Sequence, residues 1–238
     1  MDARIPSTER IQEYYDGHAK QVQARTGVNR RHRSIIRRLE RTGLLPYHSV
    51  LEIGCGIGQL SGLLSPRVPR GSVRSVDISP KAVAIARERC RDRRNITFEV
   101  GDMSDFRSKQ RFDRVVLPDV LEHIPEEGHD RLFGTIADHL SPGGAVCIHI
   151  PDPEAIHWAR RERPDLLQIV DQPLDIRLMA NRFAQHGLQL QQFERYGLWT
   201  REPDYNWIVF GRAVEHPVLT PYPRWWQLWK ELRSRFGS

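Results

Sequence analysis

Three glycines and two carboxylates follow one another in an order that could bind a nucleoside-containing ligand. Gly54, Gly56 and Gly58 stand two residues apart in VLEIGCGIGQL, directly after an apolar run. Each glycine allows the backbone to pass close to a ligand, because it has no Cβ. Asp77 ends the next apolar segment, VRSVD, and Asp102 follows the one after that. A carboxylate where Asp77 stands can accept hydrogen bonds from both ribose hydroxyls of a nucleotide.

The glycine spacing differs from that of dinucleotide-binding proteins. Their fingerprint is G-x-G-x-x-G, whereas this chain has G-x-G-x-G and carries Gln59 where the last glycine should stand. Glu52 lies two residues before the loop inside an apolar strand, where a carboxylate is costly without a partner. The pattern therefore argues against a dehydrogenase. We expect Glu52 to belong to the binding site of a different cofactor.

The segments that must position these residues alternate between strands and helices. Strands are expected at 50–54, 73–79, 95–100, 112–117, 145–150, 188–196 and 205–212, and helices at 59–64, 80–90, 127–140 and about 174–186. Such alternation predicts an α/β fold, a mostly parallel sheet with helices on both faces. The last two strands have no helix between them, so they should pair antiparallel.

Composition and charge narrow the possible classes. No window of the 238 residues approaches the roughly 18 apolar residues of a membrane span, and the N-terminus lacks the apolar core of a secretory signal. The three cysteines show no metal-binding spacing, so we expect reduced thiols, no metal site and a cytoplasmic location.

The net charge of +6 is concentrated near the N-terminus, in NRRHRSIIRRLER. At helical spacing the arginines at 30, 33, 37 and 41 share one face, and Ile35, Ile36 and Leu39 share the opposite one. This pattern indicates an amphipathic helix with a solvated basic face. A patch for an acidic substrate, a membrane surface or nucleic acid is the alternative, and nucleic acid is the less favoured because no exposed aromatics are interleaved.

Residues 50–150 resemble the class I S-adenosylmethionine-dependent methyltransferases. The resemblance rests on LEIGCGIG, VDIS, GDM, FDRVVLPDVLEHI and LSPGGAVCI, and residues 185–212 match by strand pattern only. It implies a Rossmann-like sheet of seven strands with the last strand antiparallel. It also implies S-adenosylmethionine as the cofactor and S-adenosylhomocysteine as the product.

The resemblance also assigns cofactor-binding roles to residues that follow the strands. By resemblance the methionine part lies along Gly54, Cys55, Gly56 and Gly58, the ribose on Asp77 beside Ile78, the adenine on Asp102 and the Met103 backbone, and the sulfonium end above Asp119.

The acceptor is left open by the motifs that are missing. No NPPY or DPPY follows the fourth strand, no Pro-Cys pair marks a pyrimidine C5 enzyme, and neither a lysine tetrad nor a metal-binding set of acids is evident. We expect methylation of a small-molecule hydroxyl, in a natural product, a quinone precursor or a polysaccharide sugar. An RNA methyltransferase and a non-catalytic cofactor-binding module are the alternatives.

Three histidines at the expected active edge are candidates for a general base. Histidine suits this role because its side chain titrates near neutral pH. His123 follows the fourth strand, His149 lies within the fifth, and His157 opens the long segment after it. His123 and His149 also have purely structural interpretations, as a histidine bonded to backbone and a histidine packed in the core.

Candidate substrate contacts lie on both sides of these histidines. Trp158, Arg160 and Arg161 follow His157 in a long segment that we expect to be a functional loop, although a solvated helix face is the alternative. Tyr15 lies in an N-terminal segment that in related enzymes folds over the cofactor as a lid. A helix packed on the sheet edge is the other interpretation.

Three parts of the chain are predicted. Residues 1–45 form a helical lid, residues 46–212 the methyltransferase domain, and residues 213–238 a tryptophan-rich amphipathic tail. The apolar face of the tail helix would carry Trp225, Leu228, Trp229, Leu232 and Phe236. It could pack on the domain, on a second subunit of a dimer, or on a membrane surface as a peripheral contact.

Overall fold

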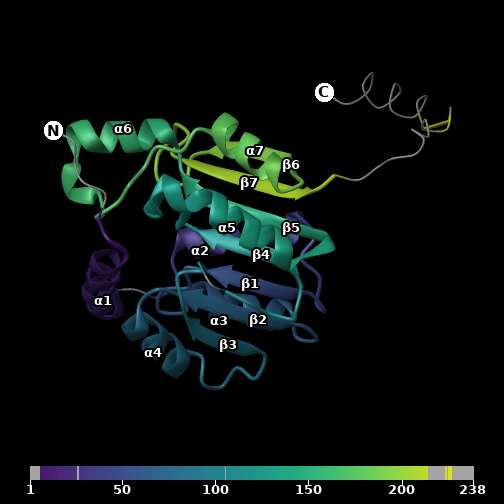
Figure 1. Ribbon diagram of the computed structural model, residues 1–238, viewed down its shortest axis with the longest axis horizontal. Coiled ribbons are helices and arrows are strands. Elements are labelled where there is room, and N and C mark those ends of the chain that lie inside the picture. Colours follow the sequence, from purple (N-terminus) through teal and green to yellow (C-terminus); the bar gives the residue numbers. More distant parts are fainter. Residues whose placement is uncertain (1–5, 26, 105, 214–222, 224, 227–238) are drawn as a thin grey trace.

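The computed structural model describes residues 6–25, 27–104, 106–213, 223 and 225–226 and contains a seven-stranded sheet (Figure 1). The strands are β1 (Ser49–Ile53), β2 (Ser72–Asp77), β3 (Ile96–Val100), β4 (Phe112–Pro118), β5 (Leu140–Pro151), β6 (Leu188–Tyr196) and β7 (Tyr205–Arg212). Their order is β3-β2-β1-β4-β5-β7-β6, and β7 is antiparallel to both of its neighbours. The predicted α/β fold, with its antiparallel last strand, is confirmed.

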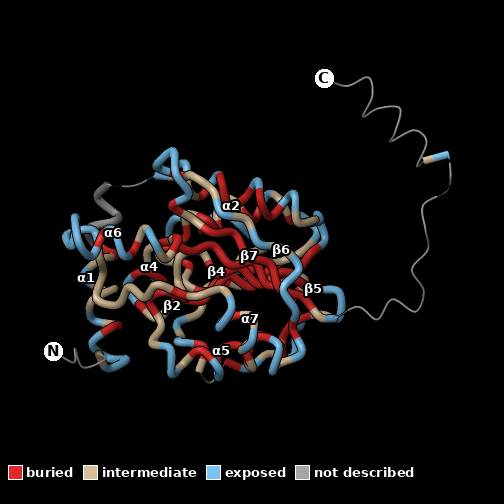
Figure 2. Tube along the Cα trace, turned by 90° about the horizontal axis from the view of Figure 1, so that it is seen from above, coloured by how far each residue is buried: buried red, intermediate tan, exposed pale blue. Residues whose placement is uncertain are grey.

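Helices cover both faces of the sheet. They are α1 (Thr8–Arg25), α2 (Arg30–Arg41), α3 (Gln59–Leu64), α4 (Pro80–Arg89), α5 (Glu126–His139), α6 (Pro153–Glu162) and α7 (Ile176–Gln185), with 3-10 turns η1 (Ser65–Arg67), η2 (Leu121–His123) and η3 (Pro164–Leu166). Figure 2 shows the buried strands between these helices. Successive strand residues point to opposite faces, so Val115 packs in the cluster under α5 and α7 while Val116 packs under α2 and α3.

Polar caps fix where two of the site-forming helices begin. The Asn29 side chain accepts hydrogen bonds from the backbone N–H groups of Arg31 and His32, and the Asn29 N–H donates to His32 Nδ1, which sets the start of α2. Ser79 accepts from the Ala82 N–H and stands directly before Pro80, and this pair of residues favours the start of α4. These caps satisfy N–H groups that a helix cannot pair internally.

The carboxyl ends of β1 to β4 meet at one edge of the sheet, and α1 lies across that edge (Figure 1). Ligands of open parallel sheets bind outside this edge. The long segment after β5 starts with a helix, the alternative to a functional loop, since α6 follows Asp152 as its cap. A cap followed by Pro153 favours a helix start there.

Most of the predicted C-terminal tail lies outside the described residues, so its helix, its dimer contact and its membrane contact stay predictions. Within the described part of the chain, no helix is long and apolar enough to cross a membrane.

Candidate cofactor and acceptor site

A cavity of about 610 Å³ opens at the carboxyl ends of β1 to β4, beneath α1. Its volume falls in the range of small-molecule sites, roughly 300–1,000 Å³. Of the residues predicted for the site, the cavity wall includes Tyr15, Gly54, Gly56, Asp77, Ile78, Asp102, Met103, Asp119 and His123. The described wall does not include Glu52, Cys55, Gly58, His149, His157, Trp158, Arg160 or Arg161.

Each of the three glycines in the loop after β1 is needed at its position for a different physical reason. All three have positive φ, a conformation that side chains disfavour. A Cβ on Gly54 would collide with the Val120 side chain, and one on Gly58 would come within 2.9 Å of the Ala86 Cβ. A Cβ on Gly56 would meet nothing within 4 Å. Gly54 and Gly58 are therefore required by packing, whereas the space at Gly56 belongs to the cavity and suits a ligand.

Glu52 supports this loop from behind. Its side chain is fully buried, and one carboxylate oxygen accepts hydrogen bonds from the hydroxyls of Ser61 (2.5 Å) and Ser75 (2.8 Å). The other oxygen has no partner. Burial raises the pKa of Glu52 to about 7, against the two serine hydrogen bonds, which lower it. The structure thus places Glu52 beneath the glycine loop, outside the described cavity wall.

Glu52→Gln should remove a pH dependence of stability. The pKa of Glu52 is raised in the folded state, so folding favours the protonated form. This contribution is fully present below the unfolded pKa of about 4.5 and is lost as pH rises to about 7, a change of order 3 kcal/mol. We expect urea unfolding at pH 5 and pH 8 to show a smaller difference for Glu52→Gln than for the wild type. If the stability difference between pH 5 and pH 8 is the same in both proteins, the pKa of Glu52 is not raised by folding.

Asp77 is held at the end of β2 by backbone groups on both sides. One oxygen accepts from the Gly56 N–H at 2.7 Å, and the other accepts from the Ser79 N–H at 2.9 Å. Burial raises its pKa, and these two hydrogen bonds oppose the rise. The carboxylate is thus oriented by the glycine loop and by the start of α4, and its remaining lone pairs can accept from ribose hydroxyls.

Asp102 and Met103 continue the wall after β3. Met103 is buried and has φ of +68°, an uncommon conformation for a residue with a side chain. Asp102 accepts a hydrogen bond from the Ser104 N–H at 2.8 Å, which closes a turn at this point. The turn brings both residues to the cavity wall, as the adenine-binding prediction requires.

Helix α1 closes the cavity from above, with Thr8, Ile11, Tyr15, His18 and Ala19 in the wall. Asp16 ties α1 to the start of α4, since it accepts from the Ser79 hydroxyl at 2.5 Å and pairs with Lys81 at 3.3 Å. Ser79 follows the ribose-binding candidate Asp77 by two residues. The contact therefore joins α1 to the segment that carries Asp77.

Asp16→Ala should speed release of the cofactor product without abolishing its binding. The substitution removes a charge-assisted hydrogen bond, worth about 1.5–3 kcal/mol at most and less at this partly exposed site. We expect a roughly threefold to tenfold faster dissociation of S-adenosylhomocysteine in stopped-flow measurements. Glu13→Ala, on an exposed position of the same helix, is the matched control. Equal rates for the two variants would show that the Asp16 contact does not hold α1 over the bound product.

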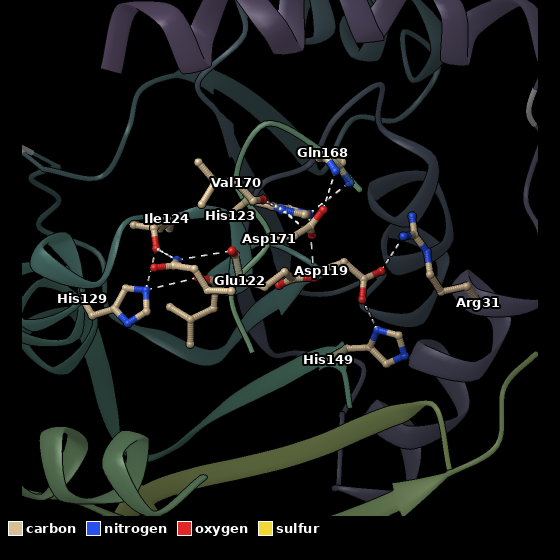
Figure 3. A network of polar contacts seen from close by, with 12 residues as sticks. Arg31, Asp119, Glu122, His123, Ile124, His129, His149, Gln168, Val170 and Asp171 are labelled. Carbon is tan, nitrogen blue, oxygen red and sulfur yellow. Dashed lines mark hydrogen bonds and ion pairs between the residues drawn. The ribbon is translucent and has the colours of Figure 1, made fainter. Parts of the chain in front are cut away.

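The side chain of Asp119, which is 7% exposed, lies at the end of β4 between two basic groups (Figure 3). Asp119 has φ of +55°. One oxygen accepts from His149 Nδ1 at 2.7 Å, and the other pairs with Arg31 Nη1 at 2.5 Å. Burial alone would raise the pKa of Asp119, but Arg31 and His149 together lower it. Arg31 also lines the cavity, although sequence reasoning did not identify it.

His123 lies on the cavity wall with both ring nitrogens engaged (Figure 3). Nδ1 lies 2.6 Å from the Val170 carbonyl oxygen and 3.3 Å from an Asp171 carboxylate oxygen. Nε2 lies 3.1 Å from the Gln168 side-chain amide nitrogen and 3.8 Å from a Glu122 oxygen. The segment after η3 therefore reaches back to fix this ring.

Glu122 is buried and both of its carboxylate oxygens lack a hydrogen-bond partner. Burial and the nearby Asp119 raise its pKa well above the ordinary value. Burial and Asp119 thus both favour the protonated form of this carboxyl. The pKa values of the two neighbouring carboxyl groups are therefore shifted in opposite directions. Arg31 and His149 lower the pKa of Asp119 and keep it ionised.

The remaining sequence candidates fall into two groups. His149 is fully buried in β5, while His157, Trp158, Arg160 and Arg161 are exposed on α6. Arg160 donates to the Asp171 carbonyl at 2.6 Å and so braces the segment that holds His123. The predicted contacts from α6 are not brought to the described cavity wall.

The described residues contain no group of three or more His, Cys, Asp and Glu that could hold a metal ion. All three cysteines are free and buried. The fit of an S-adenosylmethionine molecule therefore rests on the glycine loop, the open space at Gly56 and the oriented carboxylates of the wall.

Comparison with known proteins gives the family. The model of a methyltransferase domain matches residues 50–144. The chain is 34% identical over 196 residues to a trans-aconitate 2-methyltransferase of Mycobacterium tuberculosis (strain H37Ra), covering 79% of this chain and 70% of that protein. It is 26% identical over 202 residues to the cyclopropane-fatty-acyl-phospholipid synthase of Escherichia coli (strain K12), covering 84% of this chain and 47% of that protein.

Solved structures show the same fold at low sequence identity. The magnesium protoporphyrin IX methyltransferase from Synechocystis PCC 6803, solved with bound SAH, has a TM-score of 0.69 at 18% identity and covers 87% of this chain and 99% of its own. A glycopeptide N-methyltransferase has a TM-score of 0.63 at 18% identity, covering 76% of this chain and 94% of its own. The glycine loop, the strand-end carboxylates, the sheet order and these relatives agree, and the chain belongs to the class I S-adenosylmethionine-dependent methyltransferases.

Proposed function

We propose that the enzyme methylates a hydroxyl oxygen of a small molecule and that His123 is the general base. The observation that carries this proposal is the placement of the His123 ring, which lines the cavity and has its Nδ1 hydrogen bonded to the Val170 carbonyl. When bound, the cofactor supplies an activated methyl group, and the protein must deprotonate and align the acceptor.

The hydrogen bonds of His123 select one tautomer. A carbonyl oxygen only accepts, so Nδ1 must carry the hydrogen that is given to Val170. Nε2 then has a free lone pair, to which the Gln168 amide donates at 3.1 Å. An acceptor hydroxyl that took the place of this amide would give its proton to Nε2. The Asp171 carboxylate, 3.3 Å from Nδ1, would stabilise the resulting imidazolium.

Unpartnered polar atoms around this ring favour an acceptor with several hydroxyls. The Tyr15 hydroxyl, the Glu122 carboxyl and the Gln168 amide oxygen are all buried without a hydrogen-bond partner. Such groups cost free energy unless a ligand or water satisfies them. A polyol, a sugar of a polysaccharide, a quinone precursor or a phenolic natural product would supply the missing donors.

Methyl-ester formation on a carboxylate is the second candidate. It is favoured by the relatives named trans-aconitate 2-methyltransferase and by Arg31 and Arg131, two cationic side chains of the cavity wall. A carboxylate is already ionised at neutral pH and needs no base. The two candidates therefore differ in their requirement for His123.

The product distinguishes the two chemistries directly. Purified protein would be incubated with methyl-labelled cofactor and two panels, one of hydroxylated compounds and one of matched carboxylic acids. An ether survives mild alkali, whereas a methyl ester releases labelled methanol. We expect alkali-stable product from the hydroxyl panel. Alkali-labile product from the acid panel alone would replace the hydroxyl proposal with the carboxylate one.

An RNA acceptor is the less favoured alternative. The arginines at 30, 33, 37 and 41 are exposed on α2, as the periodicity predicts, so a basic surface exists. Binding to RNA that weakened steeply with salt would support that alternative. Three further expectations are also proposals: a cytoplasmic location, a dimer, and a peripheral membrane contact through residues 213–238.

A further inference from the structure

Positive charge is concentrated at the amino ends of the strands, on the edge of the sheet opposite the cavity. Four segments lead into β1 to β4 there, namely residues 41–48, 65–71, 90–95 and 107–111. They contain nine Arg and Lys residues and a single acidic residue, Asp92. Their net charge of +8 exceeds the +6 of the whole chain. We call the surface formed by these four segments the basic edge.

Hydrogen bonds between neighbouring segments make the basic edge one continuous surface. The Arg70 N–H donates to the Pro46 carbonyl at 2.9 Å, and the Asn95 side-chain amide donates to the Val68 carbonyl at 2.9 Å. A side-chain hydrogen bond of 3.0 Å joins Gln110 to the first residue of β2. Strands and helices separate the four segments in the sequence, so only the fold collects their charges.

Several cations of the basic edge are left without a counter-charge. Four of them are exposed and form no ion pair with the residues that the structure describes: Arg70, Arg93, Arg94 and Lys109. Like charges gathered in this way repel one another, which costs stability unless an acidic partner binds. The described cavity wall includes none of the nine cations, so binding of the cofactor and the acceptor does not explain them.

Two large apolar side chains are exposed on the same surface. Leu45 is 40% exposed and Tyr47 is 57% exposed, and both lie in the segment that enters β1. Pro46, between them, accepts the Arg70 N–H, so these side chains lie beside the 65–71 segment. Apolar and aromatic side chains among cations are typical of surfaces that enter the headgroup region of an anionic bilayer.

The C-terminal tail also leaves the domain on this side. β7 runs antiparallel to β5, so Arg212 at its end lies beside the start of β5, away from α1 (Figure 1). The Arg212 guanidinium donates to the Ala137 carbonyl at 2.6 Å, near the end of α5. Residues 213–238 contain three tryptophans and four Arg and Lys residues against two Glu, and Trp225 is 67% exposed. Tryptophan favours the boundary between water and hydrocarbon, so a bilayer suits this tail better than RNA does.

We propose that the basic edge is a docking surface for an anionic lipid bilayer. Its cations lie at headgroup level, and Leu45, Tyr47 and the tryptophans of the tail enter between the lipids. Charge and apolar insertion together give a stable attachment that either signal alone does not. The cavity is at the opposite ends of the strands, so it stays open to water in the docked enzyme. The inference extends the membrane contact expected of residues 213–238 to the folded domain, and it does not depend on the proposed acceptor.

Vesicle flotation of the full chain tests this surface. Phosphatidylcholine vesicles with and without phosphatidylglycerol would be compared for the wild type and for a variant of the four unpaired cations: Arg70→Gln, Arg93→Gln, Arg94→Gln and Lys109→Gln. The wild type should bind only the anionic vesicles and should be released by salt. Each cation near an anionic surface is worth about fivefold in affinity, so the fourfold variant should bind about a hundredfold more weakly or less. Wild-type affinity of this variant, or no binding of the wild type to anionic vesicles, would overturn the proposal.

A second variant with the same change of net charge is the matched control. It neutralises four exposed arginines outside the basic edge: Arg30→Gln, Arg33→Gln, Arg37→Gln and Arg201→Gln. Salt screens charges that do not approach the bilayer, so this variant should bind within about threefold of the wild type. An equal loss in both fourfold variants would show that net charge alone attracts the protein, and the basic edge would no longer be the docking surface.

Variants of the apolar side chains separate the domain from the tail. Leu45→Ser combined with Tyr47→Ser should weaken binding to anionic vesicles by about tenfold, because two inserted side chains are lost. Trp225→Ser combined with Trp229→Ser should also weaken it. If only the tryptophan variant loses binding, the tail alone makes the contact and the proposal for the basic edge is wrong.

Two further measurements address the alternatives. A single-stranded RNA oligomer would be titrated in parallel, and binding of RNA without binding of vesicles would replace the bilayer with nucleic acid. Calorimetry would measure S-adenosylhomocysteine with and without anionic vesicles. We expect equal affinities, because the basic edge and the cavity lie at opposite ends of the strands. Weaker binding of this ligand on vesicles would place the contact at the cavity instead and would overturn the proposal.

Discussion

His123→Ala should lower kcat with a hydroxyl acceptor by about a hundredfold or more, with little change in affinity for S-adenosylhomocysteine. A positioned general base contributes roughly 10²–10⁴ to the rate. The Nε2 lone pair of His123 accepts from the Gln168 amide in a ring that lines the cavity, and an acceptor hydroxyl could take the place of that amide. The measurement is single-turnover methyl transfer at saturating cofactor, with binding followed by calorimetry.

Other histidines provide the controls. His186→Ala removes a ring that pairs with Asp130 at the end of α7, away from the cavity wall, and should retain full activity. His157→Ala should lower kcat by less than about threefold, because this side chain is exposed on α6. Full activity of His123→Ala would remove the base assignment and would favour the carboxylate acceptor, which needs no base.

Asp77→Ala should abolish the thermal stabilisation that adenosyl ligands give to the wild type. At about a hundred times its dissociation constant a ligand adds roughly 2.7 kcal/mol, which in a protein of this size raises the midpoint by about 5–10 °C. We expect S-adenosylmethionine and S-adenosylhomocysteine to give this shift and NAD to give none. Loss of the charge-assisted hydrogen bonds to ribose should weaken binding by at least about a hundredfold.

A second substitution separates binding from folding. Asp77 also accepts from the backbone N–H groups of Gly56 and Ser79, so alanine could disturb the loop itself. Asp77→Asn keeps one acceptor oxygen and should lose most of the shift with a near-normal midpoint in the absence of ligand. Asp92→Ala, at an exposed position beyond α4, is the control. A full ligand shift in Asp77→Asn would argue against the ribose assignment.

The fold could be predicted from the sequence because its signals are local. Continuous apolar runs such as VVL in β4 are typical of strands buried on both faces. Ser79 with Pro80, and the positive-φ glycines at 54, 56 and 58, encode the loop and the helix start by residue type alone. The carboxylates at 77, 102 and 119 then reach one edge because parallel strands all end there.

The α6 region shows where local signals left two interpretations open. The long segment after β5 could be a functional loop or a solvated helix face, and in the structure Asp152 and Pro153 begin a helix whose exposed face carries Trp158 and Arg161. The histidine candidates show a related limit. The sequence proposed three of them equally, and only their hydrogen bonds separate a ring on the cavity wall from one enclosed in the sheet and one on the surface.

The sequence by itself determined the sheet, the cofactor edge and the family, because each depends on residues close together in the chain. The tertiary structure alone decided which side chains meet. Arg31 reaches Asp119 from 88 residues away, and Tyr196 reaches His149 from 47. Such pairs leave no periodic trace, because their partners come from elements that are distant in the sequence and meet only in the folded protein. Long-range packing therefore fixes the charge and tautomer of each group, and with them its part in the chemistry.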